Sequence, residues 1–144
     1  MKISYQKLHP DAIEPKRMSS GAAGYDLFAC LREELHLAPF ERVAVPTGLA
    51  ISLPENHEAQ IRPRSGLALK LGLGVLNAPG TIDSDYRGEI RVILINMSKD
   101  EVTISPGMRV AQMVIKQVES VEFEECERLD DTARAAGGFG SSGH

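Results

Sequence analysis

The sequence is poor in aromatic residues: Phe, Trp and Tyr make up 5% of its 144 residues, and Trp is absent. Val, Ile and Leu must therefore fill the core of a chain long enough for one domain. Long apolar runs are also missing, since the aliphatic stretch at residues 92–95 is far too short to cross a bilayer. The start of the sequence lacks the charged and then apolar pattern of a secretion signal. We therefore expect a cytoplasmic protein that does not contact a membrane.

Cysteine and histidine are too sparse for a disulfide framework or a zinc cluster. The two cysteines, Cys30 and Cys126, lie far apart and form no CxxC motif. We expect two free thiols in a reducing compartment, with a single disulfide as the alternative. The four histidines show no ligand spacing such as HExxH, so no structural zinc site is predicted.

The charges are unevenly distributed. Residues 119–131 contain seven acidic residues and one arginine, a local charge of −6. Because the whole chain has a formal net charge of −4, the remainder carries +2. No long basic tract is present, which argues against a nucleic-acid polymer as a partner. A small anion held by a few arginines fits the pattern better.

Alternation of apolar and polar residues dominates the chain and is typical of β-strands. Turn signals rich in Pro and Gly separate the alternating segments, so the fold class is predicted to be all-β, a sandwich or barrel. Residues 65–71 differ, because good helix formers follow a serine able to cap a helix. They predict one short helix, with another strand as the alternative. The predicted strands are residues 58–62, 91–95, 102–104, 110–118 and 121–123.

The start of the predicted helix is a candidate anion site. A helix N-terminus presents free backbone N–H groups, which attract anions. Arg64 adds a fork of charged donors beside Ser65. The alternative is a capping serine next to a solvated arginine.

Residues 74–92 contain a second candidate site. Residues 77–80 predict a turn between two strand-like runs, and the tip of such a hairpin, with the Asn77 amide, can read the edge of a base. On a strand, Asp83 and Asp85 would share one face and Tyr86 would point the opposite way. A carboxylate near a bound polyphosphate can act as a general base for water. An Asp-rich surface turn with a packed tyrosine is the alternative.

Two further segments carry polar groups of interest. Residues 105–113 read as a turn running into a strand, with Arg109 and Gln112 as candidate polar contacts. Residues 134–144 are rich in Gly and Ser but lack the Lys of GxxxxGK[ST], so they are not a Walker A loop. They read as a flexible linker, of which residues 141–144 could be left from cloning, or as a loop that closes over a phosphate.

Five segments together resemble the five ordered motifs of the trimeric dUTPases, the deoxyuridine triphosphate nucleotidohydrolases. The resemblance runs from Leu8 to the terminus and implies a jelly-roll-like β-barrel over residues 1–133. It further implies a mobile C-terminal arm, residues 134–144, and a homotrimer whose shared active sites the arms close. The activity implied is conversion of dUTP and water to dUMP and diphosphate with Mg²⁺, which limits uracil in DNA and supplies dUMP for dTMP synthesis. The five segments are residues 23–27, 63–68, 74–88, 107–112 and 134–143.

The resemblance assigns a role to each matching residue. Asp83 would activate water for attack on the α-phosphorus, and Tyr86 would pack on the deoxyribose and leave no room for a 2′-hydroxyl. Asp26 would touch Mg²⁺ through its water shell, because the ion would be held mainly by phosphate oxygens. Phe139 would stack over the base. The remaining substrate-binding residues implied for uracil are Asn77, Gly80, Thr81 and Ile82. Those implied for the phosphates are Arg64, Ser65, Gly66, Gln112, Arg134, Gly140, Ser141 and Ser142.

Two residues depart from the family's tail pattern. Ser142 stands where Thr is usual and keeps the hydroxyl group. Ala135 stands where Gly is usual, which costs about 1 kcal/mol if the position needs a positive φ. Two other readings of the chain stay open, a dCTP deaminase-like enzyme on a related fold and a non-catalytic sensor that binds dUTP.

Overall fold

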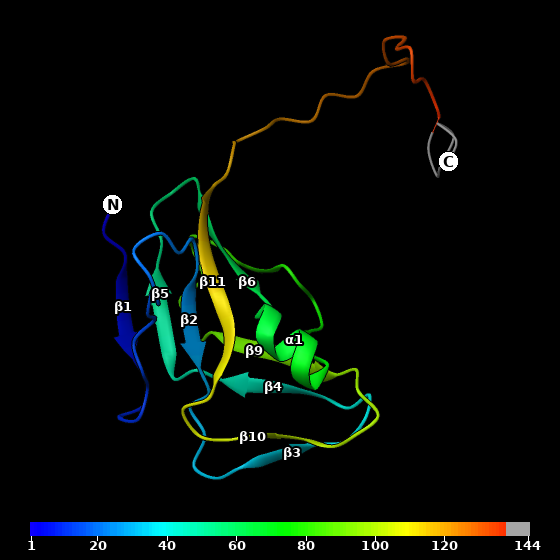
Figure 1. The fold of residues 1–144 in the computed structure, drawn as a ribbon. Helices are drawn as coiled ribbons and strands as arrows, with labels where there is room; N and C mark the ends of the chain where they lie inside the picture. Colours follow the sequence, from blue (N-terminus) through cyan, green and yellow to red (C-terminus); the bar gives the residue numbers. More distant parts are fainter. Residues whose placement is uncertain (138–144) are drawn as a thin grey trace.

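Residues 1–137 are described by a computed structural model, in which eleven strands and one short helix are found. The all-β class with a single short helix is therefore confirmed (Figure 1). The helix, α1, spans Ser65–Leu71. The strands are β1 Ser4–Lys7, β2 Tyr25–Phe28, β3 Leu35–Leu37, β4 Arg42–Pro46, β5 Leu49–Ser52, β6 His57–Arg62, β7 Leu73–Val75, β8 Gly80–Ile82, β9 Arg91–Asn96, β10 Val102–Ile104 and β11 Arg109–Gln117.

The strands form four antiparallel sheets around one core. The largest sheet has the order β2-β11-β6-β8, and the second has the order β4-β9-β7. Two-stranded pairs, β1 with β5 and β10 with β3, complete the barrel. In Figure 1, β2, β11 and β6 stand side by side while β4, β10 and β3 cross below them. The four-stranded sheet therefore presents a broad platform, and the candidate site residues are attached to it.

The core is aliphatic, as the scarcity of aromatic residues requires. Its largest fully buried apolar side chains are Leu27, Leu37, Leu49, Leu73, Ile90, Leu94, Ile104, Val45, Val92 and Val110. They come from nearly every sheet and pack into a single cluster. Burial of this kind contributes about 25 cal/mol per Å² of apolar surface removed from water, so it is the main source of stability.

Most of the predicted elements are confirmed. The alternating segments at 58–62, 91–95, 102–104 and 110–118 correspond to β6, β9, β10 and β11 within one residue at either end. The helix is also confirmed, but the cap differs from the prediction. Arg64 occupies the N-cap position and Ser65 is the first helical residue, with no side-chain cap hydrogen bond. The helix ends at Gly72, whose φ of 63° is the left-handed conformation that glycine adopts without strain.

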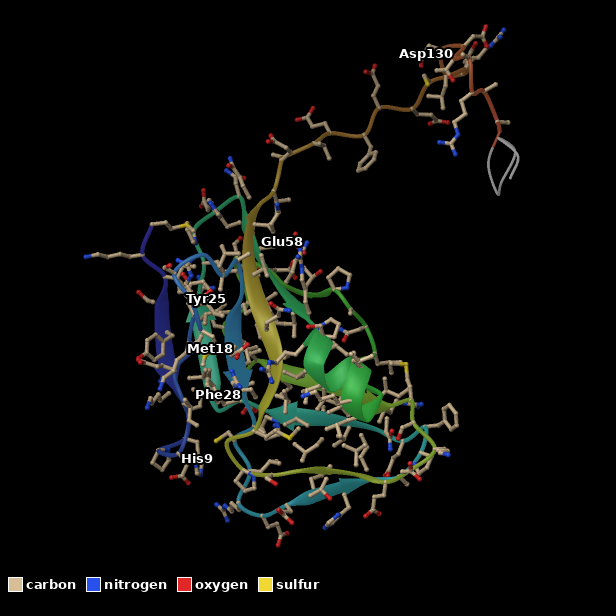
Figure 2. The ribbon with its side chains drawn as sticks, viewed as in Figure 1. His9, Met18, Tyr25, Phe28, Glu58 and Asp130 are labelled. Carbon is tan, nitrogen blue, oxygen red and sulfur yellow. The ribbon has the colours of Figure 1, made fainter. Side chains whose placement is uncertain are left out.

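The predicted strand at residues 121–123 is wrong. The last strand of the structure ends at Gln117, and the chain after it leaves the barrel without regular structure (Figure 1). Figure 2 shows Asp130 on this segment, well away from the barrel. A strand needs a neighbour to satisfy its backbone hydrogen-bonding groups, and no such neighbour lies beside these residues in one described chain. Alternation in the sequence cannot reveal that the pairing partner is missing.

A membrane-spanning helix is not found. Within residues 1–137 the only helix is the seven-residue α1, and none has the length and apolar character needed to cross a bilayer.

Candidate active site

The four-stranded sheet brings motifs that are distant in the sequence into one row. Asp26 of β2 lies opposite Gln112 of β11, and Gln112 lies opposite Arg62 of β6. Arg62 is followed after one residue by Arg64, at the N-cap of α1. Strand pairing therefore places Asp26, the candidate metal residue, near Gln112 and Arg64, which are candidate phosphate residues.

Asp26 and two arginines form a compact charged cluster. The Asp26 side chain is only 12% exposed, and its Oδ2 accepts a hydrogen bond from Arg109 Nη1 at 3.0 Å. Its Oδ1 lies 3.3 Å from Arg64 Nε. Arg64 Nη1 also donates to the backbone carbonyl oxygen of Arg109 at 2.9 Å. The cluster fixes both guanidinium groups and still leaves part of each exposed, as an anion site requires.

Gln112 borders this cluster. Its Nε2 donates to the carbonyl oxygen of Pro63 at 3.0 Å, which ties β11 to the segment that enters α1. The Gln112 side chain lies so close to Gly24 that a Cβ at position 24 would overlap Oε1. Gly24 therefore makes room for the Gln112 amide, and the motif that contains it serves the site through packing.

Ser65 and Gly66 lie at the open side of the cluster. Both are exposed, and no atom lies within 4 Å of the place that a Cβ on Gly66 would occupy. They belong to the first turn of α1, where backbone N–H groups have no partner within the helix. A ligand can therefore approach the backbone here closely.

The second group of candidate residues lines a cleft of about 390 Å³ beside β8. Its lining includes every residue of the 77–86 segment to which the sequence gave a role: Asn77, Gly80, Thr81, Ile82, Asp83 and Tyr86. The Asn77 amide lies against Gly80, because a Cβ there would be 3.1 Å from Nδ2. The cleft thus combines an amide, a carboxylate and an aromatic ring.

Two details of this segment differ from the sequence prediction. Asn77 does lie in a turn, but β7 before it pairs with β9 whereas β8 after it pairs with β6, so the turn joins two sheets and is not the tip of a hairpin. Asp83 and Asp85 do not share a strand face, because β8 ends at Ile82. The following residues form a turn in which the Tyr86 N–H donates to the Asp83 carbonyl oxygen at 3.2 Å.

Tyr86 is held in the cleft by its own neighbours. Its hydroxyl group donates to the carbonyl oxygen of Glu89 at 3.0 Å. The Glu89 carboxylate accepts from the Gly48 N–H at 2.9 Å and from Arg91 Nε at 2.8 Å. Glu89 and Arg91 also line the cleft. The sequence analysis assigned them no role, although both lie within the candidate segment 74–92.

Arg109 is the residue of the charged cluster that sequence reasoning left without a specific role. It was a candidate polar contact, and its pairing with Asp26 spans 83 positions of the chain. Contacts of this separation are set by strand pairing across the sheet, which a single segment does not encode.

The charged cluster does not contribute to the lining of the cleft. None of Asp26, Arg64, Gln112 and Arg109 is among the residues that line the cleft around Asp83. Both groups are nevertheless carried by the same sheet, on opposite sides of β6. A single described chain therefore holds two partial sites.

The C-terminal candidates are only partly described. Arg134 is exposed and its Nε donates to the Gly137 carbonyl oxygen at 2.9 Å. Ala135 has a φ of 43°, so it adopts the left-handed conformation that costs a residue with a Cβ about 1 kcal/mol. Phe139, Gly140, Ser141 and Ser142 lie outside the described residues.

The described residues fit a magnesium ion only if phosphate oxygens and water supply most of its ligands. Among residues 1–137 no three His, Cys, Asp or Glu side chains come together as ligands. Asp26 is a single carboxylate whose oxygens already form ion pairs with two guanidinium groups. Because each carboxylate oxygen has two lone pairs, it can still accept from the water shell of an ion. The donor set fits Mg²⁺ that takes most of its ligands from phosphate and keeps several waters.

The two cysteines are free thiols, as predicted. Cys126 is exposed, whereas Cys30 is half-buried, with its Sγ next to Gly48. Burial raises the pKa of the Cys30 thiol, and the nearby carboxylates of Asp11 and Glu89 raise it further. A thiol in this state is a poor nucleophile, so Cys30 has a packing role.

Comparison with known proteins gives a consistent result. Residues 11–143 match the family model described as dUTPase. A deoxyuridine 5'-triphosphate nucleotidohydrolase from Hydrogenobaculum sp. (strain Y04AAS1) is 59% identical over 143 residues, 99% of both chains. One from Wolinella succinogenes is 57% identical and covers 99% of this chain and 95% of its own.

Solved structures agree with the sequence comparison. The Staphylococcus bacteriophage 80alpha dUTPase, as a G164S mutant with dUpNHpp, superposes with a TM-score of 0.90 at 26% identity, over 99% of both chains. This likeness confirms the predicted jelly-roll-like β-barrel. With a matching family model over nearly its full length and relatives of this similarity, the chain belongs to the dUTPase family.

Proposed function

We propose that this chain is a dUTP diphosphatase, which hydrolyses dUTP to dUMP and diphosphate. The observation that carries the proposal is the cleft in which Asn77, Asp83 and Tyr86 meet, in a chain of the dUTPase family. The activity limits the uracil available for incorporation into DNA and supplies dUMP for dTMP synthesis.

The base is read by the turn before β8 and by β8 itself. β8 is the edge strand of its sheet, so residues Gly80–Ile82 have backbone N–H and C=O groups on the side away from β6. Together with the Asn77 amide they pair with the edge of uracil. Cytosine presents a reversed donor and acceptor pattern, which leaves polar groups of the protein unpaired and is strongly rejected.

Asp83 activates the attacking water. Its side chain borders the cleft and is exposed to solvent, so a water molecule can reach it. The carboxylate orients the water and accepts a proton as the water oxygen attacks the α-phosphorus in line with the diphosphate leaving group. The P–O bond to diphosphate breaks, and the new oxygen stays on dUMP. Asp85 has no part in this step.

The triphosphate is held by the charged cluster and the arm. Arg64, Ser65, Gly66 and Gln112 contact the phosphates, while Arg134, Gly140, Ser141 and Ser142 close over the terminal one and Phe139 stacks on the base. Fixed positive charge and N–H groups stabilise the charge that develops on the leaving diphosphate. Asp26 would hold a hydrated Mg²⁺ through the water shell of the ion, which would supply further neutralisation of the phosphate charge.

The enzyme is a homotrimer that shares its sites between subunits. Two observations support this assembly. The phosphate cluster and the base cleft do not meet in one chain, and the segment after Gln117 leaves the barrel with Phe123 98% exposed. Val121 and Leu129 are also exposed on this segment, and several exposed apolar side chains together mark a surface that contacts another protein. In this arrangement residues 1–133 form the domain that contains the barrel, and residues 134–144 form the C-terminal arm.

The place of action is the cytoplasm, and the ligand is a nucleotide and not a nucleic-acid polymer. Two free thiols, one of them exposed at Cys126, suit a reducing compartment. The absence of a long basic tract in the sequence argues against binding to a nucleic-acid polymer.

Hydrolysis in ¹⁸O-labelled water tests this function. The purified chain is incubated with dUTP and Mg²⁺, and the products are resolved by mass spectrometry. We expect dUMP and diphosphate in equal amounts, with the label on dUMP. Label in diphosphate, or release of dUDP and orthophosphate, would contradict attack at the α-phosphorus. Tight binding without turnover would identify a sensor, and release of ammonia from dCTP would identify a deaminase.

A further inference from the structure

The ring of Tyr86 lies directly over Gly88. A Cβ placed on Gly88 would be 2.5 Å from Tyr86 Cζ and 3.0 Å from Cε2, and it would overlap the hydroxyl oxygen. Packed protein interiors do not tolerate such approaches. Gly88 therefore leaves the space that the ring occupies, and any side chain at this position must displace the ring.

The same ring is anchored at both ends. At its tip, the hydroxyl group donates to the Glu89 carbonyl oxygen at 3.0 Å. At its base, the backbone N–H of Tyr86 donates to the Asp83 carbonyl oxygen at 3.2 Å. Glu89 is itself fixed, because its carboxylate accepts from the Gly48 N–H and pairs with Arg91. The backbone of residues 83–89 thus holds a side chain that is 43% exposed in one orientation.

We propose that Gly88 is a positioning residue for sugar specificity, because the bare backbone at this position lets the hydroxyl end of the Tyr86 ring lie against it, at the wall of the cleft. This inference rests on the proposed function, in which Tyr86 packs on the deoxyribose. A wall excludes a 2′-hydroxyl only if it cannot move away. The hydrogen bond to the Glu89 carbonyl oxygen holds the Tyr86 ring in place, and the close contact with Gly88 lets the ring occupy that position.

Gly88→Ala tests whether Gly88 makes room for the Tyr86 ring, and it does so without straining the backbone. Gly88 does not have a positive φ, so an L-residue can adopt its conformation. The atoms that its methyl group meets belong to the exposed end of a side chain, which can swing out. Gly88→Ala should therefore displace the ring while the barrel stays folded. Gly21→Ala is the matched control, since no atom lies within 4 Å of a Cβ there.

The first measurement is kcat/KM for dUTP and for UTP in the wild type and both variants. We expect Gly88→Ala to lower the ratio of the two values by about tenfold, chiefly because UTP becomes a better substrate. Gly21→Ala should keep the wild-type ratio. Unchanged discrimination in Gly88→Ala would overturn the inference and leave the proposed function in place.

A double-mutant cycle separates displacement of the ring from other effects of the methyl group. Tyr86→Ala removes the wall, so a further Gly88→Ala change should leave the ratio of dUTP to UTP where Tyr86→Ala puts it. If Gly88→Ala lowers the ratio equally in both backgrounds, position 88 acts by another route and the inference is wrong.

A measurement without nucleotide keeps the inference independent of activity. In protein with ¹³C-labelled tyrosine, the ring signals of Tyr86, assigned with Tyr86→Phe, should shift in Gly88→Ala but not in Gly21→Ala. Unshifted Tyr86 signals in Gly88→Ala would overturn the inference whatever the kinetics. If the wild type hydrolyses no dUTP, the proposed function fails. The shifts of the Tyr86 ring signals then show on their own whether Gly88 positions the Tyr86 ring.

Discussion

Asp83 allows the sharpest test at the level of single residues. Asp83→Asn keeps the size of the side chain but removes its capacity to take a proton from water. We expect kcat to fall by at least about a hundredfold while the affinity for dUTP stays nearly the same. Steady-state turnover and calorimetric titration with a non-hydrolysable dUTP analogue measure the two quantities.

The control for this variant lies on the same turn. Asp85 is exposed, two positions further on, and has no role in the proposed mechanism. Asp85→Asn should therefore retain nearly full turnover, because surface substitutions outside special features have small effects. Near-normal turnover in Asp83→Asn would remove Asp83 from the mechanism.

Asp26 shows how one residue can serve two purposes. Its nearly buried carboxylate keeps Arg64 and Arg109 in fixed positions, at 3.3 and 3.0 Å. Arranging charged donors before the substrate arrives saves the cost of organising them during the reaction. The proposed contact with hydrated Mg²⁺ uses the lone pairs that remain, so both roles are compatible in one side chain.

Strands and the helix were predicted correctly where the pattern within their own segment determines the structure. Strands such as β6 and β10 follow from period-two alternation, and α1 follows from its helix formers. The strand predicted at residues 121–123 has the same alternation, but pairing needs a neighbour that lies outside its own sequence. The end of β8 at Ile82 was missed for a related reason. β-propensity does not report where a partner strand stops.

The candidate site likewise has one part that a single segment predicts and one part that depends on strand pairing. The segment from Asn77 to Tyr86 is contiguous, so sequence reasoning collected its members, and the structure brings them together in one cleft. The charged cluster depends on pairing of β2 with β11 and of β11 with β6, which joins residues as far apart as Asp26 and Arg109. That cluster could be inferred only from resemblance to a family, and the role of Arg109 in it was missed.

The C-terminal arm is an element that can be removed without touching the barrel. β11 ends at Gln117, and within residues 1–137 no residue after Val114 belongs to the buried core. A chain that stops at Ala133 should keep its melting temperature and its oligomeric state. It should lose at least about tenfold in turnover, because Arg134, Ser141 and Ser142 no longer help to position the triphosphate.

The matched control for the truncation lacks only His144, which lies beyond the family motif. Turnover assays compare the two shortened chains, and analytical ultracentrifugation measures their assembly. If the chain that stops at Ala133 dissociates into monomers, the arm is required for assembly. The proposed division between barrel and arm then fails.

At the scale of the whole molecule, the charges are separated in space. Residues 119–131 carry −6 and lie on the segment that leaves the barrel, so the rest of the chain carries +2. The region that holds Arg64 and Arg109 is therefore more attractive to an anion than the net charge of −4 indicates. The acidic segment also stays away from the phosphate cluster within one chain, as a substrate that carries several negative charges requires.

The proposal that subunits share their active sites can be tested with trimers that contain two different variants. Asp83→Asn and Arg64→Ala subunits, co-expressed with different tags and purified by both, should be active although each variant alone is inactive. In such a trimer about one site in three takes Asp83 from an Arg64→Ala subunit and Arg64 from an Asp83→Asn subunit. The control mixes Asp83→Asn with Asn77→Ala. Both residues line one cleft of the same chain, so no site in that mixture recovers both groups. Activity in the first mixture but not in the second supports shared sites, whereas two inactive mixtures mean that each subunit completes its own site.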